Sequence, residues 1–172
     1  MSRPLTFCEM LDENQEDFNR FMLGRLIGSG EGRGVYECPV NKRFVFKIEN
    51  LRSDPPFQNV REWTTWSQLE DHPEARAWLA PCEMISRGGS VLMQRRTRPL
   101  KCREDLDGIK LPNFLADAHW QNLGYIGKRL VCHDYAFTRI AARGVRGFKL
   151  VPAAKVRMCA GHTRKPFVSA TT

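Results

Sequence analysis

The chain has 172 residues, of which 42% are hydrophobic and 27% are charged. This composition is typical of one globular domain, and it excludes both a disordered tail and a large multidomain enzyme. The 27 lysines and arginines exceed the 19 aspartates and glutamates, so the formal net charge is +8. Most of the excess lies from residue 127 onward, where Asp134 is the one acidic residue. We therefore expect this part to attract a polyanion, whether a nucleic acid, an acidic protein face or a phosphorylated ligand.

The six cysteines are scattered along the chain and form no C-x-x-C pair. This spacing favours a reducing compartment over a secreted, disulfide-bonded scaffold. The first residues lack the apolar region of a signal peptide, and no apolar run approaches the roughly 18 residues needed to cross a bilayer. The sequence therefore predicts a cytoplasmic protein with no membrane partner.

The first predicted elements are strands and a helix. Residues 1–20 are polar and acidic, and we expect at most one short helix there. Alternating apolar residues predict strands at 35–36 and 44–48, joined by a Pro-Val-Asn-Lys turn. After two prolines, the spacing predicts a helix over 58–71.

Glu62, Trp66 and Leu69 fall at positions i, i+4 and i+7 of this predicted helix. They share one helical face, so a carboxylate lies among two large apolar groups. A carboxylate on the inward face of a helix needs a cationic partner. We expect such a partner for Glu62.

The rest of the chain is predicted to contain fewer regular elements. In chain order they are a short helix at 73–79, strands at 82–85 and 90–94 around Gly88-Gly89, an irregular connector at 95–111, a loop before a strand at 129–132, and a possible helix at 138–143. The order is therefore strands and a helix first, followed by a connector and a loop-rich half.

The first pattern that indicates chemistry is Gly28-Ser-Gly-Glu-Gly-Arg-Gly-Val35, which opens the first hairpin. Glycines let backbone N–H groups approach phosphate oxygens, because no Cβ is in the way. The pattern is not a Walker loop, since no Gly-Lys-Ser/Thr follows, and not a dinucleotide fingerprint, since a strand follows instead of a helix. The alternative is a flexible turn.

Two further groups of polar residues follow. Lys47 lies in an otherwise apolar strand, where its ammonium could hold nucleotide phosphates if Glu62 fixed it. The alternative is a strand lysine that faces solvent. Asp117, Asn122 and Asp134 supply one carboxylate to orient an attacking hydroxyl, plus an amide and a second carboxylate as oxygen ligands for Mg²⁺. Singly, these three are ordinary surface and turn residues.

In this order the residues resemble a very small protein kinase-like fold, closest to the compact kinase-like proteins encoded by bacteriophages. Gly28, Gly30 and Val35 match the pattern G-x-G-x-x-G-x-V, and the third glycine position holds Arg33, next to Gly32. The resemblance implies that these residues, with Lys47, bind ATP.

The second part of the resemblance concerns catalysis. Lys47 and Glu62 match the strand lysine and its helix partner, and the resemblance implies that both are catalytic. Asp117 and Asn122 match the catalytic-loop pair, and Asp134-Tyr-Ala the Asp-Phe-Gly signature. The resemblance implies that Asp117 orients the acceptor hydroxyl and that Asn122 and Asp134 bind Mg²⁺. His119 gives the form D-x-H-x-x-N, which is similar to aminoglycoside and choline kinase-like enzymes.

The resemblance implies an α+β fold that forms a single domain over 1–172. Residues 21–94 would form a kinase-like N-lobe, with an antiparallel sheet and one main helix, and 95–172 a much reduced, loop-rich C-lobe with a basic tail. The expected function is ATP- and Mg²⁺-dependent phosphate transfer to Ser/Thr of host proteins and of the chain itself. A phage protein of this kind would act in the host bacterial cytoplasm, against transcription or defence proteins.

The chain also departs from the kinase pattern. Few residues separate Gln94 from Asp117, only 38 follow Asp134, and no A-P-E sequence is present. Leu115 stands in place of the His-Arg-Asp histidine, and Ala136 in place of a glycine. An alternative is therefore a kinase-like protein with weak or no catalysis, which binds and inhibits a host protein or nucleic-acid complex through its basic C-terminal part.

A third alternative is a zinc site. Cys132-His133 and Cys159-x-x-His162 supply four plausible ligands, although their spacing matches no recognised pattern.

Overall fold

The computed structural model describes residues 17, 21–30, 32–50, 57–115, 117–138, 140 and 149–156. The fold is mixed α+β, with mainly antiparallel sheets and few helices, which confirms the α+β part of the expected fold class. Its contacts divide the chain into two compact units: unit 1 comprises Met1–Asn59 and Pro81–Arg96, and unit 2 comprises Val60–Ala80 and Thr97–Thr172.

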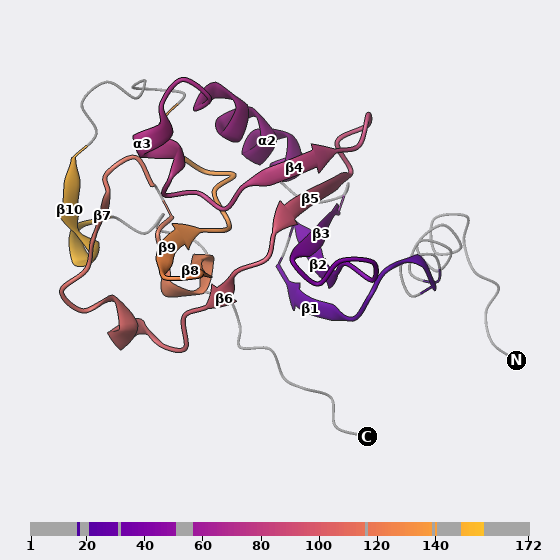
Figure 1. Cartoon of the computed structure of the whole chain (residues 1–172), viewed down its shortest axis with the longest axis horizontal. Coiled ribbons are helices and arrows are strands. Elements are labelled where there is room, and N and C mark those ends of the chain that lie inside the picture. The colour runs from indigo at the N-terminus through magenta and orange to yellow at the C-terminus, as the bar shows by residue number, and fades with distance from the viewer. Residues whose placement is uncertain are drawn as a thin grey trace, which may run out of the picture. The chain divides into compact units, whose positions relative to one another are not determined.

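Unit 1 contains a five-stranded sheet in the order β1-β2-β3-β5-β4, in which every neighbouring pair is antiparallel (Figure 1). Its strands are β1 (Leu26–Ser29), β2 (Arg33–Glu37), β3 (Phe44–Glu49), β4 (Cys82–Ile85) and β5 (Val91–Arg95). The hairpin β4–β5 turns at Gly88-Gly89, as the sequence predicts, and Gly89 has a φ of 76° that a residue with a Cβ rarely adopts.

The buried face of β3 is the polar one. Lys47 and Glu49 are buried with Val45, whereas Phe44, Phe46 and Ile48 on the other face are half-buried. The alternation itself follows from the two-residue period of a strand. Burial of a lysine and a glutamate requires hydrogen-bonded or charged partners, so this face is more than apolar packing.

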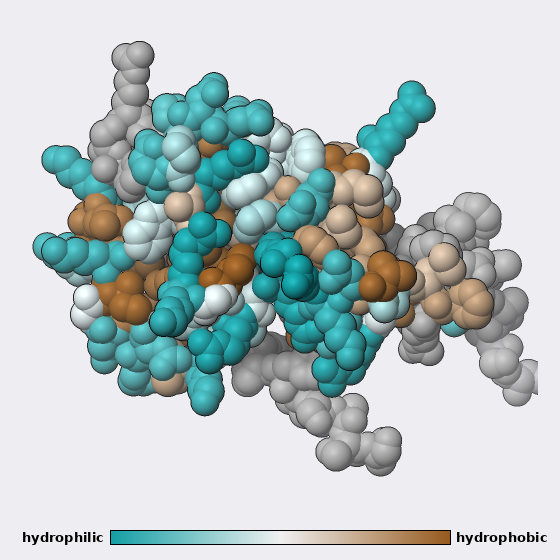
Figure 2. All heavy atoms as spheres, in the orientation of Figure 1, coloured by the Kyte–Doolittle hydropathy of each residue, from teal (hydrophilic) through white to brown (hydrophobic). Residues whose placement is uncertain are grey.

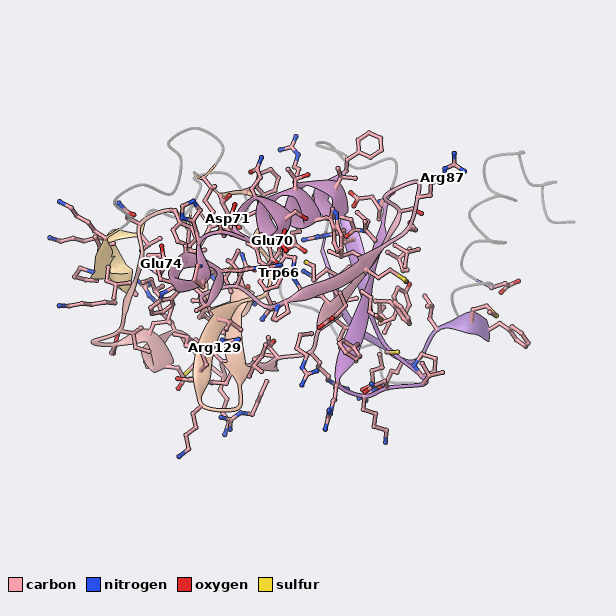
Figure 3. All side chains as sticks on the ribbon, turned by 45° about the horizontal axis from the view of Figure 1, so that its top comes forward. Trp66, Glu70, Asp71, Glu74, Arg87 and Arg129 are labelled. Carbon is pink, nitrogen blue, oxygen red and sulfur yellow. The ribbon has the colours of Figure 1, made fainter. Side chains whose placement is uncertain are left out.

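Two helices connect β3 to β4 along the chain. Helix α2 (Gln58–Gln68) ends three residues before the predicted boundary, and α3 (Pro73–Arg76) is one turn long, with proline at its start. The connection between them bears the acidic side chains Glu70 and Asp71 (Figure 3). The Arg76 guanidinium carbon lies 3.8 Å from the centroid of the Trp66 ring, and this cation–π contact holds α3 to α2 within unit 2.

Unit 2 contains two small antiparallel sheets (Figure 1). One has the order β6-β8-β9 and the other pairs β7 with β10; the strands are β6 (Arg98–Pro99), β7 (Lys110–Pro112), β8 (Leu123–Ile126), β9 (Arg129–Cys132) and β10 (Leu150–Pro152). In the described part of unit 2, the 3₁₀ helices η1 (Arg103–Leu106) and η2 (Trp120–Asn122) lie between strands along the chain, and η3 (Ala153–Lys155) follows β10.

Of these strands, the sequence predicts only β9, and the predicted bounds, 129–132, agree with the observed ones. The expected irregular connector at 95–111 contains β6, η1 and most of β7, the loop before β9 contains β8, and the tail contains β10. These strands have only two to four residues. Such lengths are too short to show a periodicity, and the strands form because distant segments pair with them.

The core of unit 2 is formed by residues from all of its parts. Leu79, Leu111, Leu123, Val131 and Tyr135 are fully buried. Leu79 forms a parallel bridge with Cys132, and the backbone of Cys132 donates to Trp78 O and accepts from Ala80 N, both at 2.8 Å. The segment after α3 is therefore bound to the end of β9.

Side chains on the visible surface are mostly hydrophilic, with smaller hydrophobic areas between them (Figure 2). Within the part of the chain that the structure describes, no helix is long and apolar enough to cross a membrane. The helices expected at 1–20 and 138–143 lie almost wholly outside the described residues.

Candidate functional site

The glycine cluster forms the turn between β1 and β2. Gly28 lies within β1 opposite Val35, and Gly30 N donates to Arg33 O at 2.9 Å. A Cβ added to Gly28 would only touch Val35, at 3.6 Å, whereas a Cβ on Gly32 would overlap the Gln58 side chain. A Cβ at position 32 would therefore require the end of the flexible Gln58 side chain to move, whereas position 28 has room for a Cβ.

Arg33 was predicted with the phosphate-binding residues. It is the first residue of β2 and is buried, and its Nη1 donates to Asn59 Oδ1 at 3.2 Å. This guanidinium is therefore engaged within unit 1.

Lys47 lies in the centre of the five-stranded sheet, opposite Val35 in β2 and Leu92 in β5. Its side chain is 3% exposed, which excludes the alternative of a lysine that faces solvent. Gln94 is on the same buried face of the sheet, and its Nε2 donates to Cys82 Sγ at 3.8 Å. Its Oε1 accepts no hydrogen bond from any residue that the structure describes. Sequence reasoning missed Gln94, which alternates with apolar residues in an ordinary strand.

Glu62 is completely buried in α2, and Leu69, in the turn directly after the helix, is completely buried as well. Its Oε1 accepts a hydrogen bond from the backbone N–H of Tyr135 at 2.8 Å. This donor is a backbone amide, which the spacing of the helix could not predict. The bond stabilises the carboxylate and holds the residue that follows Asp134.

Asp117 and Asn122 lie on either side of the start of η2. Asn122 Nδ2 donates to the backbone oxygen of Asp117 at 2.9 Å and to Asp117 Oδ2 at 3.1 Å. Both donors of the amide point toward Asp117, so Oδ1 is the atom of Asn122 that is left to bind a cation. His119 caps η2, since its Nδ1 accepts from Gln121 N.

Asp134 follows β9 in a segment with several anchors. His133 N donates to Asn122 O at 2.8 Å, and the Cys132 thiol donates to Asp134 O at 3.2 Å. The buried Tyr135 donates its hydroxyl to Ala80 O at 2.7 Å. Hydrogen bonds on both sides of Asp134 therefore determine where its backbone lies.

Together these contacts connect the predicted residues of unit 2. Glu62 binds Tyr135, the neighbour of Asp134; His133, its other neighbour, binds Asn122; and Asn122 binds Asp117. We refer to these contacts as the unit 2 hydrogen-bond chain. The predicted phosphate-binding residues and Lys47 belong to unit 1.

Sequence reasoning also missed Glu49 and Asn59, both of which are buried. The carboxylate of Glu49 accepts from Gln58 N and Asn59 N, each at 2.9 Å. Two spacings could have identified them: Glu49 shares the strand face of Lys47, and Asn59 precedes Glu62 by three residues in α2.

The zinc alternative receives no support from the described residues. His133 Nε2 donates to Gln121 O at 2.9 Å, since a carbonyl can only accept, and Nδ1 bonds Thr97 Oγ1 at 2.9 Å. Both ring nitrogens are thus engaged. Among the described residues no group of three or more His, Cys, Asp or Glu side chains could hold a metal, and Cys159 and His162 lie outside that part.

The hydrogen bonds and buried polar residues within each unit are therefore the features from which a function is inferred. No protein-family model matches the chain, and no curated protein sequence matches it.

Proposed function

We propose that this chain is a minimal protein kinase-like phosphotransferase, which uses ATP and Mg²⁺ to phosphorylate Ser/Thr hydroxyls of bacterial host proteins and of itself. The observation that carries the proposal is the unit 2 hydrogen-bond chain. It connects four residues for which the sequence predicts a catalytic or metal-binding role: Glu62, Asp117, Asn122 and, through its two neighbours, Asp134.

The topology of unit 1 also supports the proposal. Its five-stranded sheet is antiparallel, as is expected for a kinase-like N-lobe. Helix α2 follows β3 and precedes β4 along the chain; its first two residues, Gln58 and Asn59, belong to unit 1, and the rest of the helix belongs to unit 2. In unit 2, short strands and 3₁₀ helices are what a reduced, loop-rich C-lobe would contain.

Lys47 and Gly28 would bind the phosphates of ATP. Burial of a lysine in a sheet destabilises a protein unless the charge has a partner, so its position favours a specific electrostatic role. The proposal assigns it to the phosphates, with Glu62 as its partner carboxylate. Gly28 has no packing reason to be glycine, which is consistent with a backbone that phosphate oxygens approach.

The residues present suit Mg²⁺. An amide oxygen of Asn122 and the carboxylate of Asp134 are hard oxygen donors, and Mg²⁺ is commonly bound by one or two protein oxygens together with phosphates and water. When bound, the ion would neutralise charge that develops on the phosphates. Asn122 would contribute Oδ1, because its amide nitrogen donates to Asp117.

Asp117 would orient the acceptor hydroxyl and accept its proton. Its Oδ2 receives a hydrogen bond from Asn122, which holds the carboxylate in one orientation. Positioning and charge neutralisation supply most of the rate enhancement in phosphoryl transfer, so a small chain with well-held side chains meets the main requirement.

The test is incubation of the full chain with γ-labelled ATP and Mg²⁺, alone and with a bacterial lysate. We expect Lys47→Ala and Asp134→Ala each to lower label transfer by at least about 100-fold. Lys42→Ala and Asp107→Ala, which change exposed residues of the same types, are the matched controls and should retain transfer.

Unchanged transfer in Lys47→Ala or Asp134→Ala would refute the assignments. If the folded wild-type chain transfers no label, it is not a kinase. Capture of a host partner by such an inactive chain would favour the binding protein described above.

A further inference from the structure

Asn59, the second residue of α2, is completely buried, and its carboxamide contacts three other segments of unit 1. Nδ2 donates to Lys47 O and to Ser90 O, both at 3.0 Å, and Oδ1 accepts from Arg33 Nη1 at 3.2 Å. Both N–H donors of the side chain and one lone pair of its oxygen are therefore used. A buried amide with this many partners holds its neighbours in a defined geometry.

Glu49 adds a second connection between β3 and the start of α2. Its two carboxylate oxygens accept from the first two backbone N–H groups of the helix, Gln58 and Asn59, each at 2.9 Å. Such groups have no partner inside a helix, and a negative charge is favourable at that end of the helix dipole. We refer to the contacts of Asn59 and Glu49 as the Asn59 network.

We propose that Asn59 is a positioning residue for ATP binding, which acts through Lys47; this rests on the proposed function. Asn59 holds the backbone carbonyl of Lys47 itself. It also binds Arg33, where β2 leaves the glycine turn. Within unit 1, Glu49 likewise holds the start of α2 on β3, the strand that bears Lys47.

Asn59→Asp is the most informative variant because it preserves size and the acceptor for Arg33. It replaces two donors with a carboxylate oxygen that repels the carbonyls of Lys47 and Ser90. Asn59→Ser removes the same donors without adding charge, and Glu49→Gln weakens the connection at the helix start. Leu69→Ala is the matched control: it removes a fully buried side chain from the turn that follows α2 and leaves the network intact.

The measurement is the KM for ATP and the kcat of phosphate transfer in the full chain, together with the melting temperature of each variant. We expect Asn59→Asp and Asn59→Ser to raise the KM for ATP roughly tenfold or more, and Glu49→Gln to raise it less. Leu69→Ala should lower the melting temperature at least as much as the Asn59 variants do, while its KM for ATP stays at the wild-type value. A purely structural role would not separate KM from melting temperature in this way.

The other outcomes contradict the inference. An unchanged KM in the folded Asn59 variants, or an equal rise in Leu69→Ala, would show that Asn59 only stabilises the fold. The same conclusion would follow if all three network variants failed to fold while Leu69→Ala folded. A wild-type chain that neither transfers phosphate nor displaces a fluorescent ATP analogue would refute the proposed function as well, which distinguishes the two failures.

Discussion

At the scale of single residues, the interior of this protein contains several polar groups with specific partners. Glu62 and Asn59 form hydrogen bonds to residues 73 and 31 positions away, and Asn122 binds Asp117 within its own loop. Burial of such groups destabilises a protein when their partners are removed, because the remaining group is then neither solvated nor bonded. Their substitution is therefore expected to alter both stability and the placement of the candidate site.

The glycines of the N-terminal hairpin allow a structural role to be separated from a binding role. A Cβ at Gly28 would meet only Val35, so Gly28→Ala should change the free energy of unfolding by less than about 0.5 kcal/mol while it raises the KM for ATP. Gly24→Ala is the contrasting variant, because its Cβ would lie 2.6 Å from the Glu37 carbonyl oxygen. We expect it to destabilise the fold by about 1–3 kcal/mol. Urea denaturation measures the free energy of unfolding of both variants. A clear destabilisation of Gly28→Ala would contradict the prediction.

Glu37 provides a pH-dependent contribution to stability. A hydrogen bond from Arg25, at 3.3 Å, and another from Arg96, at 3.0 Å, lower the pKa of its carboxyl, in opposition to partial burial. A lowered pKa in the folded state stabilises the protein above the pKa of the unfolded chain, and this stabilisation is lost as pH falls through the folded pKa. The melting temperature of Glu37→Gln should therefore be below that of the wild type at neutral pH.

This difference should vanish in acid and shrink in high salt, which screens exposed charges. Thermal melts of the two proteins over a pH series would measure it. A difference that persists at low pH would show that the carboxylate charge is not its cause.

At the scale of elements, the segment 132–135 is held by both α2 and the residues after α3. Its contacts are with Glu62 in α2, with Ala80, and, at the end of β9, with Trp78. All of these lie in unit 2. The position of Asp134 is thus determined by α2, by the segment after α3 and by β9, and a change in any of them is expected to alter the candidate metal site.

Removal of the Tyr135 hydroxyl tests this connection. Tyr135→Phe leaves Ala80 O without the donor that lies 2.7 Å away in the interior, so we expect a loss of about 1–2 kcal/mol in the free energy of unfolding. Tyr125→Phe is the control: Tyr125 is half-buried under Arg98, whose guanidinium carbon is 5.4 Å from the ring centroid, and a phenyl ring preserves that contact. Equal losses in the two variants, measured by chemical denaturation, would contradict the assigned role.

At the scale of the whole molecule, the dominant property is charge. With a net charge of +8, the chain should bind polyanions in low salt whatever its catalytic activity. Three of the positive charges, Arg157, Arg164 and Lys165, follow the last described residue. Others are exposed in unit 1, including Arg87, which points away from the β4–β5 turn (Figure 3).

Affinity for single-stranded DNA as a function of salt tests which of these charges matter. If the C-terminal residues contact phosphates, replacing all three with Gln should reduce the slope of log affinity against log salt by about 0.7 per lost contact. The matched control replaces three exposed basic residues of unit 1 with Gln, namely Lys42, Arg43 and Arg87. It should leave the slope unchanged. A slope that falls only in the control would place the contact in unit 1.

Several features of the fold were predictable because they depend on neighbouring residues. The period-two pattern and the Gly-Gly turn predict β4 and β5, the helical spacing predicts α2, and a short apolar run predicts β9. Local preference is sufficient for these elements, since each signal lies within one of them. The residues of the candidate site were predicted from residue type and order, and their roles stay predictions.

The remaining features depend on contacts that no local pattern contains. Glu62 and Tyr135 are 73 residues apart, Asn59 and Ser90 are 31 apart, and the short strands β6, β7, β8 and β10 form through pairing with distant segments. By itself, therefore, the sequence determined the composition, the strong elements and the chemistry of the candidate residues. Only the tertiary structure decided that Lys47 is buried, that Arg33 binds Asn59 and that a backbone amide binds Glu62, because burial and hydrogen bonding depend on which distant segments are brought together.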